Sequence, residues 1–366
     1  MATEKEEKKE KGSLKVNKGV DQPTQINTDA LQRFRSAKKA DLPPDEYLEG
    51  LRSGNRSIFS KAITLVESTL PRHQDIAQQI IEKCLPYSGD SVRVGITGVP
   101  GVGKSTFIEA LGLYLIGQGK KIAVLAIDPS SERSKGSILG DKTRMEDLAN
   151  HDHAFIRPSA SAGSLGGVAR KTKESIILCE AAGYDVIFVE TVGVGQSETA
   201  VHSMVDFFLL LMLAGAGDEL QGIKRGIMEM ADAILINKAE GDNLHKARMA
   251  KREYQNALHL YPANPSGWSP VVDLCSALQK KGIENVWSMI EKYITLTKAN
   301  GYFSRNRKEQ AINIMFDSIN QRLKDHFYSD PEIRKKIETL QNDILQDKIS
   351  SYMAAQELLN TYFKKT

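Results

Sequence analysis

The middle of the chain alternates short, strongly apolar segments with longer amphipathic ones. The apolar segments are too short for helices and are typical of buried strands. Strands of this kind, separated by helices, favour a mostly parallel sheet that is covered on both faces. We therefore predict an α/β fold, with candidate strands at Val92–Thr97, Ile122–Ile127, Ala154–Ile156, Val186–Val189, Phe207–Leu213, Ala233–Ile236 and Val271–Leu274.

The N-terminal part lacks this alternation. Residues 1–25 are rich in Lys and Glu and have no apolar periodicity, so we predict a disordered tail there. Residues 26–88 are predicted to form an N-terminal helical region, in which Asp45 can cap the first helix. Apolar residues recur at helical spacing, on the first helix at Leu48, Leu51, Ile58, Ile63 and Leu65 and on a second at Ile76, Ile80, Ile81 and Leu85.

The C-terminal part is helical by pattern and follows the predicted sheet domain of residues 89–300. Residues 301–366 are predicted to form a helical arm with no sheet of its own to cover. Its apolar stripes are expected to pack on the core or on another subunit. The stripes contain Ile312, Met315, Phe316, Ile319 and Leu323, and after Asp330-Pro331 they contain Ile333, Ile337, Leu340 and Ile344.

Composition excludes several classes of protein. The 366 residues carry a formal net charge of +3, which gives no reason to expect nucleic acid or a membrane as a partner. Cys84, Cys179 and Cys275 lie far apart and indicate neither a disulfide framework nor a zinc site, so we expect a reduced, cytoplasmic setting. The N-terminus has no apolar core for a signal peptide and is rich in Glu, unlike a transit peptide. The apolar run Phe207–Ala214 is too short to span a bilayer.

A phosphate-binding motif follows the first predicted strand and opens a predicted helix. Its sequence matches G-x-x-x-x-G-K-[ST] in the structural context that this motif requires. The glycines let backbone N–H groups face phosphate oxygens, and the positive end of the helix adds to the attraction. Lys104 is expected to contact the β- and γ-phosphates, and the Ser105 hydroxyl to bind Mg²⁺. The predicted loop consists of Gly98, Val99, Pro100, Gly101, Val102, Gly103, Lys104, Ser105 and Thr106.

Three carboxylates are candidates for metal binding and for positioning a water molecule. Asp128 follows a strand beside the phosphate loop, where it would hold Mg²⁺ or serve as a turn residue. Asp141 lies in Gly140-Asp141-Lys142-Thr143-Arg144 and is a second metal candidate, or a solvated loop charge. Glu190 ends a predicted strand where many GTPases have Asp-x-x-Gly, and would reach the metal or cap the next helix. With Lys104, these three are the predicted catalytic residues.

Two short motifs after later strands indicate which base is bound. Asn237-Lys238-Ala239-Glu240 is similar to the Asn-Lys-x-Asp motif of guanine-binding proteins, with Glu240 in place of Asp. Asp242 lies two residues further on and is an alternative acid. The second motif, in which backbone N–H groups would meet the guanine O6 atom, is Ser276, Ala277 and Leu278. The pattern predicts guanine as the preferred base.

Together these residues resemble the MeaB/ArgK/MMAA family of GTPases over roughly residues 45–300. Beyond the phosphate loop, the resemblance rests on longer segments that a generic P-loop protein lacks. These segments are Asp128-Pro129-Ser130-Ser131, Gly140–Met145, Arg157-Pro158-Ser159, Gly163–Gly167, Glu190–Glu198 and Asp218–Lys224.

The resemblance implies a P-loop sheet with N-terminal helices and a C-terminal arm used for homodimerisation. It implies that GTP hydrolysis is coupled to loading and protection of an adenosylcobalamin-dependent methylmalonyl-CoA mutase, or a related acyl-CoA mutase. Mg²⁺ with GTP or GDP is expected at the site, and no tightly held cofactor of its own. Gly193, Gly195 and Gln196 would form a switch next to the γ-phosphate. Glu219, Gln221 and Lys224 look like part of a loop that signals to the mutase, although Lys224 would also suit a solvated helix charge.

Two other functions compete with this one. A metal-insertion GTPase shares the P-loop architecture but tends to carry His-rich or clustered Cys segments, which the sequence lacks. A nucleotide-driven kinase or transport accessory protein would need a second substrate pocket with basic residues, which the sequence does not identify. No arginine finger is evident either, so we expect slow intrinsic hydrolysis that a partner stimulates.

Overall fold

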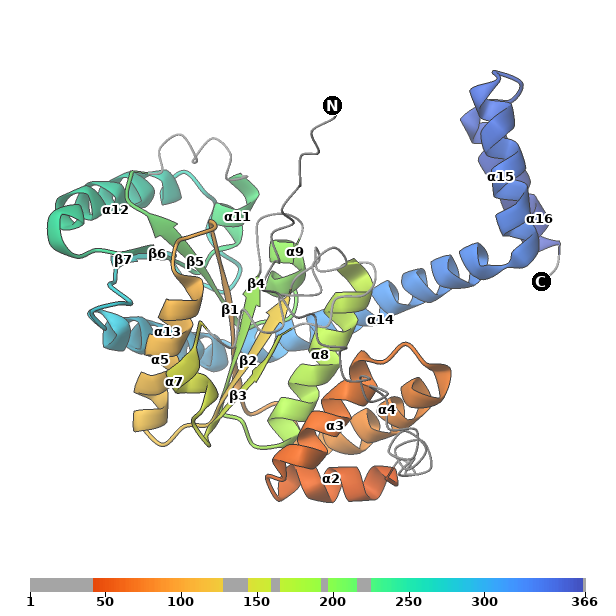
Figure 1. Cartoon of the computed structure of the whole chain (residues 1–366). Helices are drawn as coiled ribbons and strands as arrows, with labels where there is room; N and C mark the ends of the chain where they lie inside the picture. Colours follow the sequence, from red (N-terminus) through yellow and green to blue (C-terminus); the bar gives the residue numbers. More distant parts are fainter. Residues whose placement is uncertain (1–41, 128–143, 159–164, 192–196, 216–224, 365–366) are drawn as a thin grey trace, which may run out of the picture. The chain divides into compact units, whose positions relative to one another are not determined.

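The computed structural model describes residues 42–127, 144–158, 165–191, 197–215 and 225–364. All of the described helices and strands lie in one compact unit, Pro44–Thr366. Figure 1 shows its central sheet with helices on both sides.

The sheet has seven strands in the order β3-β2-β4-β1-β5-β6-β7, and every neighbouring pair is parallel. The predicted α/β P-loop fold is confirmed, and all seven predicted strands are present. β1 lies at the centre between β4 and β5, so the loop that follows it opens at the middle of the sheet. The strands are β1 (Val92–Gly98), β2 (Ile122–Ile127), β3 (Ala154–Arg157), β4 (Val186–Thr191), β5 (Phe207–Leu213), β6 (Ala233–Asn237) and β7 (Val271–Leu274).

Helices cover both faces, so nearly every residue of β1, β2, β4, β5 and β6 is buried. One face is covered by α5 (Lys104–Gly117), α7 (Glu146–Ala149) and α13 (Ile283–Ala299), with α5 packed against both of the others. The other is covered by α8 (Leu165–Ala181) and α9 (Ser197–His202). The remaining elements of the sheet domain are α11 (Arg225–Met230), α12 (Leu244–Leu258) and the short 3₁₀ helix η2 (Gly241–Asn243).

Three N-terminal helices pack on each other and on α8. They are α2 (Pro44–Arg52), α3 (Arg56–Glu67) and α4 (Pro71–Cys84), followed by the 3₁₀ helix η1 (Leu85–Tyr87). The prediction of one helix from Asp45 to Leu65 is wrong, because Gly54 has a left-handed φ of 76°. The Asn55 side chain then caps α3 by accepting hydrogen bonds from Ser57 N and Ile58 N. Asp45 lies in the first turn of α2, where its carboxylate pairs with Lys83.

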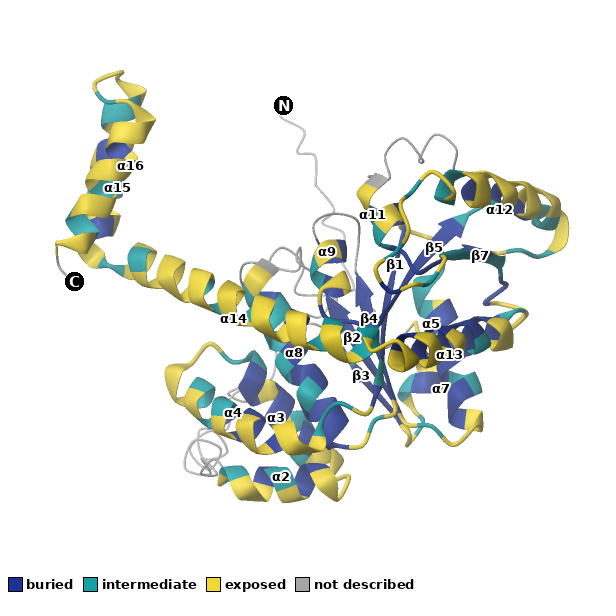
Figure 2. Cartoon of the chain, turned by 180° about the vertical axis from the view of Figure 1, so that it is seen from behind, coloured by how far each residue is buried: buried dark blue, intermediate teal, exposed yellow. Residues whose placement is uncertain are grey.

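The C-terminal helices are α14 (Tyr302–Ser329), α15 (Pro331–Leu345) and α16 (Ser351–Phe363). The first half of α14 packs on α8 and α13, whereas α15 and α16 pack on each other and α15 meets the end of α14. Figure 2 shows the contrast in burial between the dark sheet and the largely exposed C-terminal helices. The predicted apolar stripe of α14 is about half exposed in this chain, at Ile312, Met315, Phe316, Ile319 and Leu323.

Candidate nucleotide site

The phosphate loop connects the end of β1 to the start of α5, as the sequence predicts. Gly98 ends the strand with a φ of 152°, and a Cβ atom there would lie 2.4 Å from the carbonyl oxygen of Leu211 on β5. Gly103 has a φ of 92° and directly precedes α5. Both positions therefore require glycine. Val99 and Val102 are buried in the hydrophobic core, and their packing holds the loop against the sheet domain.

Lys104 is the first residue of α5 and folds back over the loop. Its ammonium donates a hydrogen bond to the carbonyl oxygen of Gly98 at 2.8 Å. Burial lowers the pKa of Lys104, the nearby carboxylates of Glu190 and Glu198 act to raise that pKa, and Arg144 acts to lower it. The lysine is therefore held at the mouth of the loop, where a polyphosphate would supply further negative charge.

Glu190 lies beside the loop because β4 pairs with β1. The backbone register matches Ile96 with Glu190, and the Thr191 hydroxyl donates to the Thr97 hydroxyl at 2.9 Å. Glu190 was predicted to end its strand, but β4 continues through it to Thr191. Glu190 is 5% exposed and lies within the sheet. Glu190, and Ser105 in the phosphate loop, carry oxygen atoms of the kind that Mg²⁺ prefers.

The predicted base-binding motifs are joined to the phosphate loop by one side chain. Asn237 is 1% exposed at the end of β6. Its amide nitrogen donates to the carbonyl oxygen of Val102 at 2.8 Å, and its amide oxygen accepts from Ala277 N at 3.1 Å. Ala239 N also donates to the carbonyl oxygen of Cys275 at 3.0 Å. The segments Asn237–Glu240 and Ser276–Leu278, which are far apart in sequence, therefore lie next to the phosphate loop at the carboxyl ends of the strands.

Glu240 closes the Asn237–Glu240 motif just after β6 and is partly buried. Its Oε2 atom is buried and has no hydrogen-bond partner among the described residues. A buried carboxylate oxygen without a donor is costly, and a guanine base would supply two N–H groups to it. Asp242, the alternative acid, is exposed. Lys238, which has a φ of 57°, and Leu278 are also exposed, while Ser276 is buried with its hydroxyl bonded to Gln279 N.

Several predicted site residues lie outside the described residues. They are the metal candidates Asp128 and Asp141, the switch residues Gly193, Gly195 and Gln196, and the signalling residues Glu219, Gln221 and Lys224. Of the predicted catalytic set, the described part of the chain contains Lys104 and Glu190, and it brings both to the loop.

Glu198 is a charged residue of this site to which the sequence assigned no individual role. It lies in α9, is 1% exposed, and acts electrostatically on Lys104. In the sequence it reads as an ordinary acidic residue in the first turn of a helix. Its burial comes from the packing of α9 on β1 and β4, which periodicity in a helix this short does not reveal.

No group of three or more His, Cys, Asp or Glu side chains gathers as a metal site in the described ranges. None of the helices described there is both long and apolar enough to cross a membrane.

Comparison with known proteins gives consistent matches along the chain. Residues 59–332 match the family described as methylmalonyl Co-A mutase-associated GTPase MeaB. A probable GTPase of Mycobacterium tuberculosis is 47% identical over 319 residues, covering 86% of this chain and 95% of that protein. GTPase ArgK of Escherichia coli is 44% identical over 322 residues, covering 87% and 97%. The mitochondrial methylmalonic aciduria type A homolog of Mus musculus is 43% identical over 328 residues, covering 87% and 79%.

A solved structure gives the same picture of the fold. A crystal structure titled LAO/AO transport system kinase has a TM-score of 0.71 and 38% sequence identity. The match covers 89% of this chain and 99% of that one.

Proposed function

From the premise that this chain belongs to the family of methylmalonyl Co-A mutase-associated GTPases, MeaB, we propose that its GTPase cycle serves an adenosylcobalamin-dependent acyl-CoA mutase. The chain is a P-loop GTPase, as are its named relatives. In this proposal GTP hydrolysis gates the loading of the cofactor and protects the mutase, with methylmalonyl-CoA mutase as the first candidate. The observation that carries the proposal is the family match over residues 59–332, together with the assembled nucleotide site.

Hydrolysis needs the negative charge of the β- and γ-phosphates to be offset. Lys104 and the N–H groups of the loop Gly98–Thr106 are positioned for this. Mg²⁺, when bound, would neutralise charge on the phosphate oxygens. Ser105 and Glu190, with Asp128 and Asp141, are the residues proposed to hold it, and their hard oxygen donors suit this ion.

Base selection is proposed to rest on Glu240. Its buried, unpartnered Oε2 atom supports this role, since an adenine has no N–H group at N1 to donate. Asn237 would act mainly by holding the phosphate loop and the Ser276–Leu278 segment in place next to each other.

Communication with the mutase is proposed to run through the switch residues Gly193, Gly195 and Gln196 and the segment with Glu219, Gln221 and Lys224. The described flanks of both segments border the nucleotide site: β4 contains Glu190, and β5 lies beside β1. A loop in either place would change its contacts when the γ-phosphate is lost.

A homodimer formed by the C-terminal helices is the proposed assembly. The apolar stripe of α14 is exposed at Ile312, Met315, Phe316, Ile319 and Leu323. Contiguous exposed apolar side chains on one helix are typical of protein–protein contacts. The cytoplasmic setting remains a proposal, supported by three free, buried thiols at Cys84, Cys179 and Cys275.

The decisive experiment measures GTP hydrolysis with and without an adenosylcobalamin-dependent methylmalonyl-CoA mutase. We expect slow turnover alone and a rise of at least about tenfold on addition of the mutase, because the sequence offers no secure candidate for an arginine finger. The Lys104→Ala variant should lose hydrolysis in both conditions while keeping its fold by circular dichroism.

Two results would contradict the proposal. Turnover that is fast alone and unchanged by the mutase would separate this GTPase from the mutase. Retained turnover in the Lys104→Ala variant would mean that the lysine has been given the wrong role. A transport accessory role is the second candidate, because one similar solved structure is titled a transport system kinase. Phosphorylation of an added substrate-binding protein would favour that role.

A further inference from the structure

A second cation, Arg144, lies at the nucleotide site besides Lys104. The sequence contains it in Gly140-Asp141-Lys142-Thr143-Arg144 but assigns no role to it. Burial lowers the pKa of Lys104, and the charge of Arg144 acts in the same direction, so the two side chains lie within electrostatic reach of each other. Arg144 is exposed and makes no hydrogen bond or ion pair with another described residue.

The short helix α7, which begins two residues after Arg144, fixes the position of the backbone there. The carboxylate of Glu109 on α5 accepts hydrogen bonds from Asp147 N at 3.0 Å and from Leu148 N at 3.5 Å. Met145, next to Arg144, is 1% exposed in the hydrophobic core. Figure 1 shows α7 beside α5, and the two helices pack on each other. The start of α7 is therefore held against α5.

This attachment brings Arg144 toward the phosphate loop. Glu109 lies about 7.5 Å along the axis of α5 from Lys104, given the rise of 1.5 Å per residue. Because β2 and β3 are parallel, the chain between them returns from the carboxyl ends of the strands to the start of β3. Arg144 precedes α7 on this return and therefore lies on the side of α7 where the phosphate loop is.

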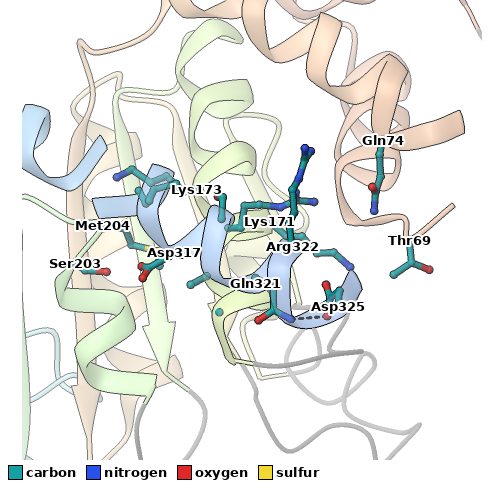
Figure 3. A pocket seen from close by; sticks show the side chains of 16 residues that line it. Thr69, Gln74, Lys171, Lys173, Ser203, Met204, Asp317, Gln321, Arg322 and Asp325 are labelled. Carbon is teal, nitrogen blue, oxygen red and sulfur yellow. Dashed lines mark hydrogen bonds between the residues drawn. The ribbon is translucent and has the colours of Figure 1, made fainter. Parts of the chain in front are cut away.

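Other cations of the described chain are held elsewhere. Arg157, at the end of β3, is paired with a carboxylate of α3. Arg93 and Arg307 pair with carboxylates near the start of β1. Figure 3 shows a pocket of about 260 Å³ between α8 and α14, on the other face of the sheet from α5, which is lined by the cations Lys171, Lys173 and Arg322 and by no residue of the phosphate loop. Of these cations, Arg144 is the one that is both unpaired and near Lys104.

Two cations close together are stabilised by an anion that both can bind. A triphosphate in the loop would bring anionic oxygen atoms to Lys104 and Arg144 at once. The guanidinium suits this task, because its planar set of N–H groups binds phosphate oxygens in pairs.

We propose that Arg144 is a further catalytic residue of GTP hydrolysis, whose guanidinium binds the γ-phosphate. In this reaction the water oxygen forms a bond to the γ-phosphorus as the bond to the bridging oxygen breaks, which yields GDP and phosphate. Negative charge spreads over the phosphoryl oxygens in the transition state, and Arg144 offsets it without losing its proton. The proposal rests on GTP hydrolysis by this chain and not on the mutase proposed as its partner.

This role agrees with slow hydrolysis in the absence of a partner. GTPases that supply such an arginine from their own chain still turn over at only about 0.01 per second.

The test is single-turnover GTP hydrolysis by the whole chain with Mg²⁺ and without a mutase, together with the affinity for a fluorescent GDP analogue. Arg144→Ala should lower the hydrolysis rate at least about tenfold, because the arginine acts in the transition state. Its affinity for GDP, which has no γ-phosphate, should change by less than about twofold. Arg144→Lys keeps the charge but not the paired N–H groups and should recover part of the rate.

Lys121→Ala is the matched control, because Lys121 is exposed just before β2, at the opposite end of that strand from the nucleotide. Its hydrolysis rate should equal that of the unchanged protein. The proposal is overturned if Arg144→Ala hydrolyses GTP at the unchanged rate, or if its rate and its GDP affinity fall by the same factor, which would indicate a structural role. Equal losses of rate in Arg144→Ala and Lys121→Ala would also overturn it, since they would indicate a general effect of charge. A mutase that fails to stimulate hydrolysis would contradict the proposed function and leave this inference standing.

Discussion

Single side chains at the edge of the sheet carry much of what this GTPase needs. Asn237 ties the Ser276–Leu278 segment to the phosphate loop through two hydrogen bonds, and Glu240 has a buried oxygen atom with no partner among the described residues. Buried polar groups of this kind are sensitive to substitution, because a lost partner leaves the desolvation cost unopposed.

Glu240 leads to a prediction about the choice of nucleotide. Glu240→Ala should reduce the preference for GTP over ATP by roughly tenfold to a hundredfold, since hydrogen bonds to a charged acceptor contribute about 1.5–3 kcal/mol. Glu240→Asp should keep or improve that preference. Competition binding with a fluorescent GDP analogue measures both, and Asp242→Ala, which changes an exposed acid nearby, is the control. Loss of selectivity in Asp242→Ala alone would move the base contact to that residue.

Asp232 leads to a prediction about pH. It is 5% exposed and accepts a hydrogen bond from Phe208 N, and burial raises its pKa from 3.8 to about 7. The folded chain therefore binds more protons than the unfolded chain between about pH 4 and pH 7, and this group lowers the free energy of unfolding as pH rises through that window. Asp232→Asn should remove the effect and still accept from Phe208 N.

Thermal unfolding at several pH values tests this prediction. Asp232→Asn should be more stable than the unchanged protein at pH 8, by about 1–4 kcal/mol, and the difference should shrink toward zero near pH 4. A difference that is the same at both pH values would show that Asp232 is not the group that titrates.

At the scale of elements, α14 is anchored to the sheet by buried charges. Arg307 of α14 donates to both carboxylate oxygens of Asp206, at 2.7 and 2.6 Å, and to the carbonyl oxygens of Gly89 and Ser91. Arg93 of β1 makes a bidentate pair with Glu180 of α8 at 2.8 Å. These contacts lie near the start of β1, at the opposite end of the strand from the phosphate loop. Those of Arg307 join the arm to the GTPase domain.

Arg307→Ala should therefore destabilise the chain by about 3–5 kcal/mol, because it leaves the buried carboxylate of Asp206 without its main partner. Lys308→Ala, at the exposed neighbouring position, should change stability by no more than about 0.5 kcal/mol. Urea unfolding followed by circular dichroism measures both. Equal stability of the two variants would mean that the ion pair adds little to the attachment of α14.

At the scale of the whole molecule, the question is how the exposed arm is covered. The apolar stripe of α14 is about half exposed, and Phe316 is 55% exposed. If the stripe forms the proposed dimer, the double change Phe316→Glu and Ile319→Glu should give a monomer by light scattering. GTP hydrolysis without a partner should continue, since Phe316 and Ile319 belong to the C-terminal arm and not to the nucleotide site.

The control for this prediction is Lys324→Gln, which alters an exposed charge on the same helix and should leave the dimer intact. If the double variant keeps the dimer mass, α14 is excluded as the interface. The same holds if the protein without substitutions is already a monomer.

The sequence by itself determined the strands and the phosphate loop, because both depend on local properties. Runs such as Phe207–Leu213 are apolar at every position, and Gly98–Thr106 carries its own turn geometry in its glycines. Asn237 and Glu240 could be proposed as base-binding residues for the same reason, since they lie at the end of a recognisable strand and just after it. The prediction of a single helix failed at Gly54-Asn55, where a glycine with positive φ and a capping asparagine begin a new helix.

Only the tertiary structure decided which distant residues meet. The strand order β3-β2-β4-β1-β5-β6-β7 places Glu190 beside the phosphate loop, and the packing of short α9 buries Glu198 near Lys104. Likewise, the pairing of Arg307 with Asp206 and the unpartnered ammonium of Lys173 depend on how α14 lies against the sheet and α8. Burial and counter-charge are properties of the packed chain, and residue type and spacing do not contain them.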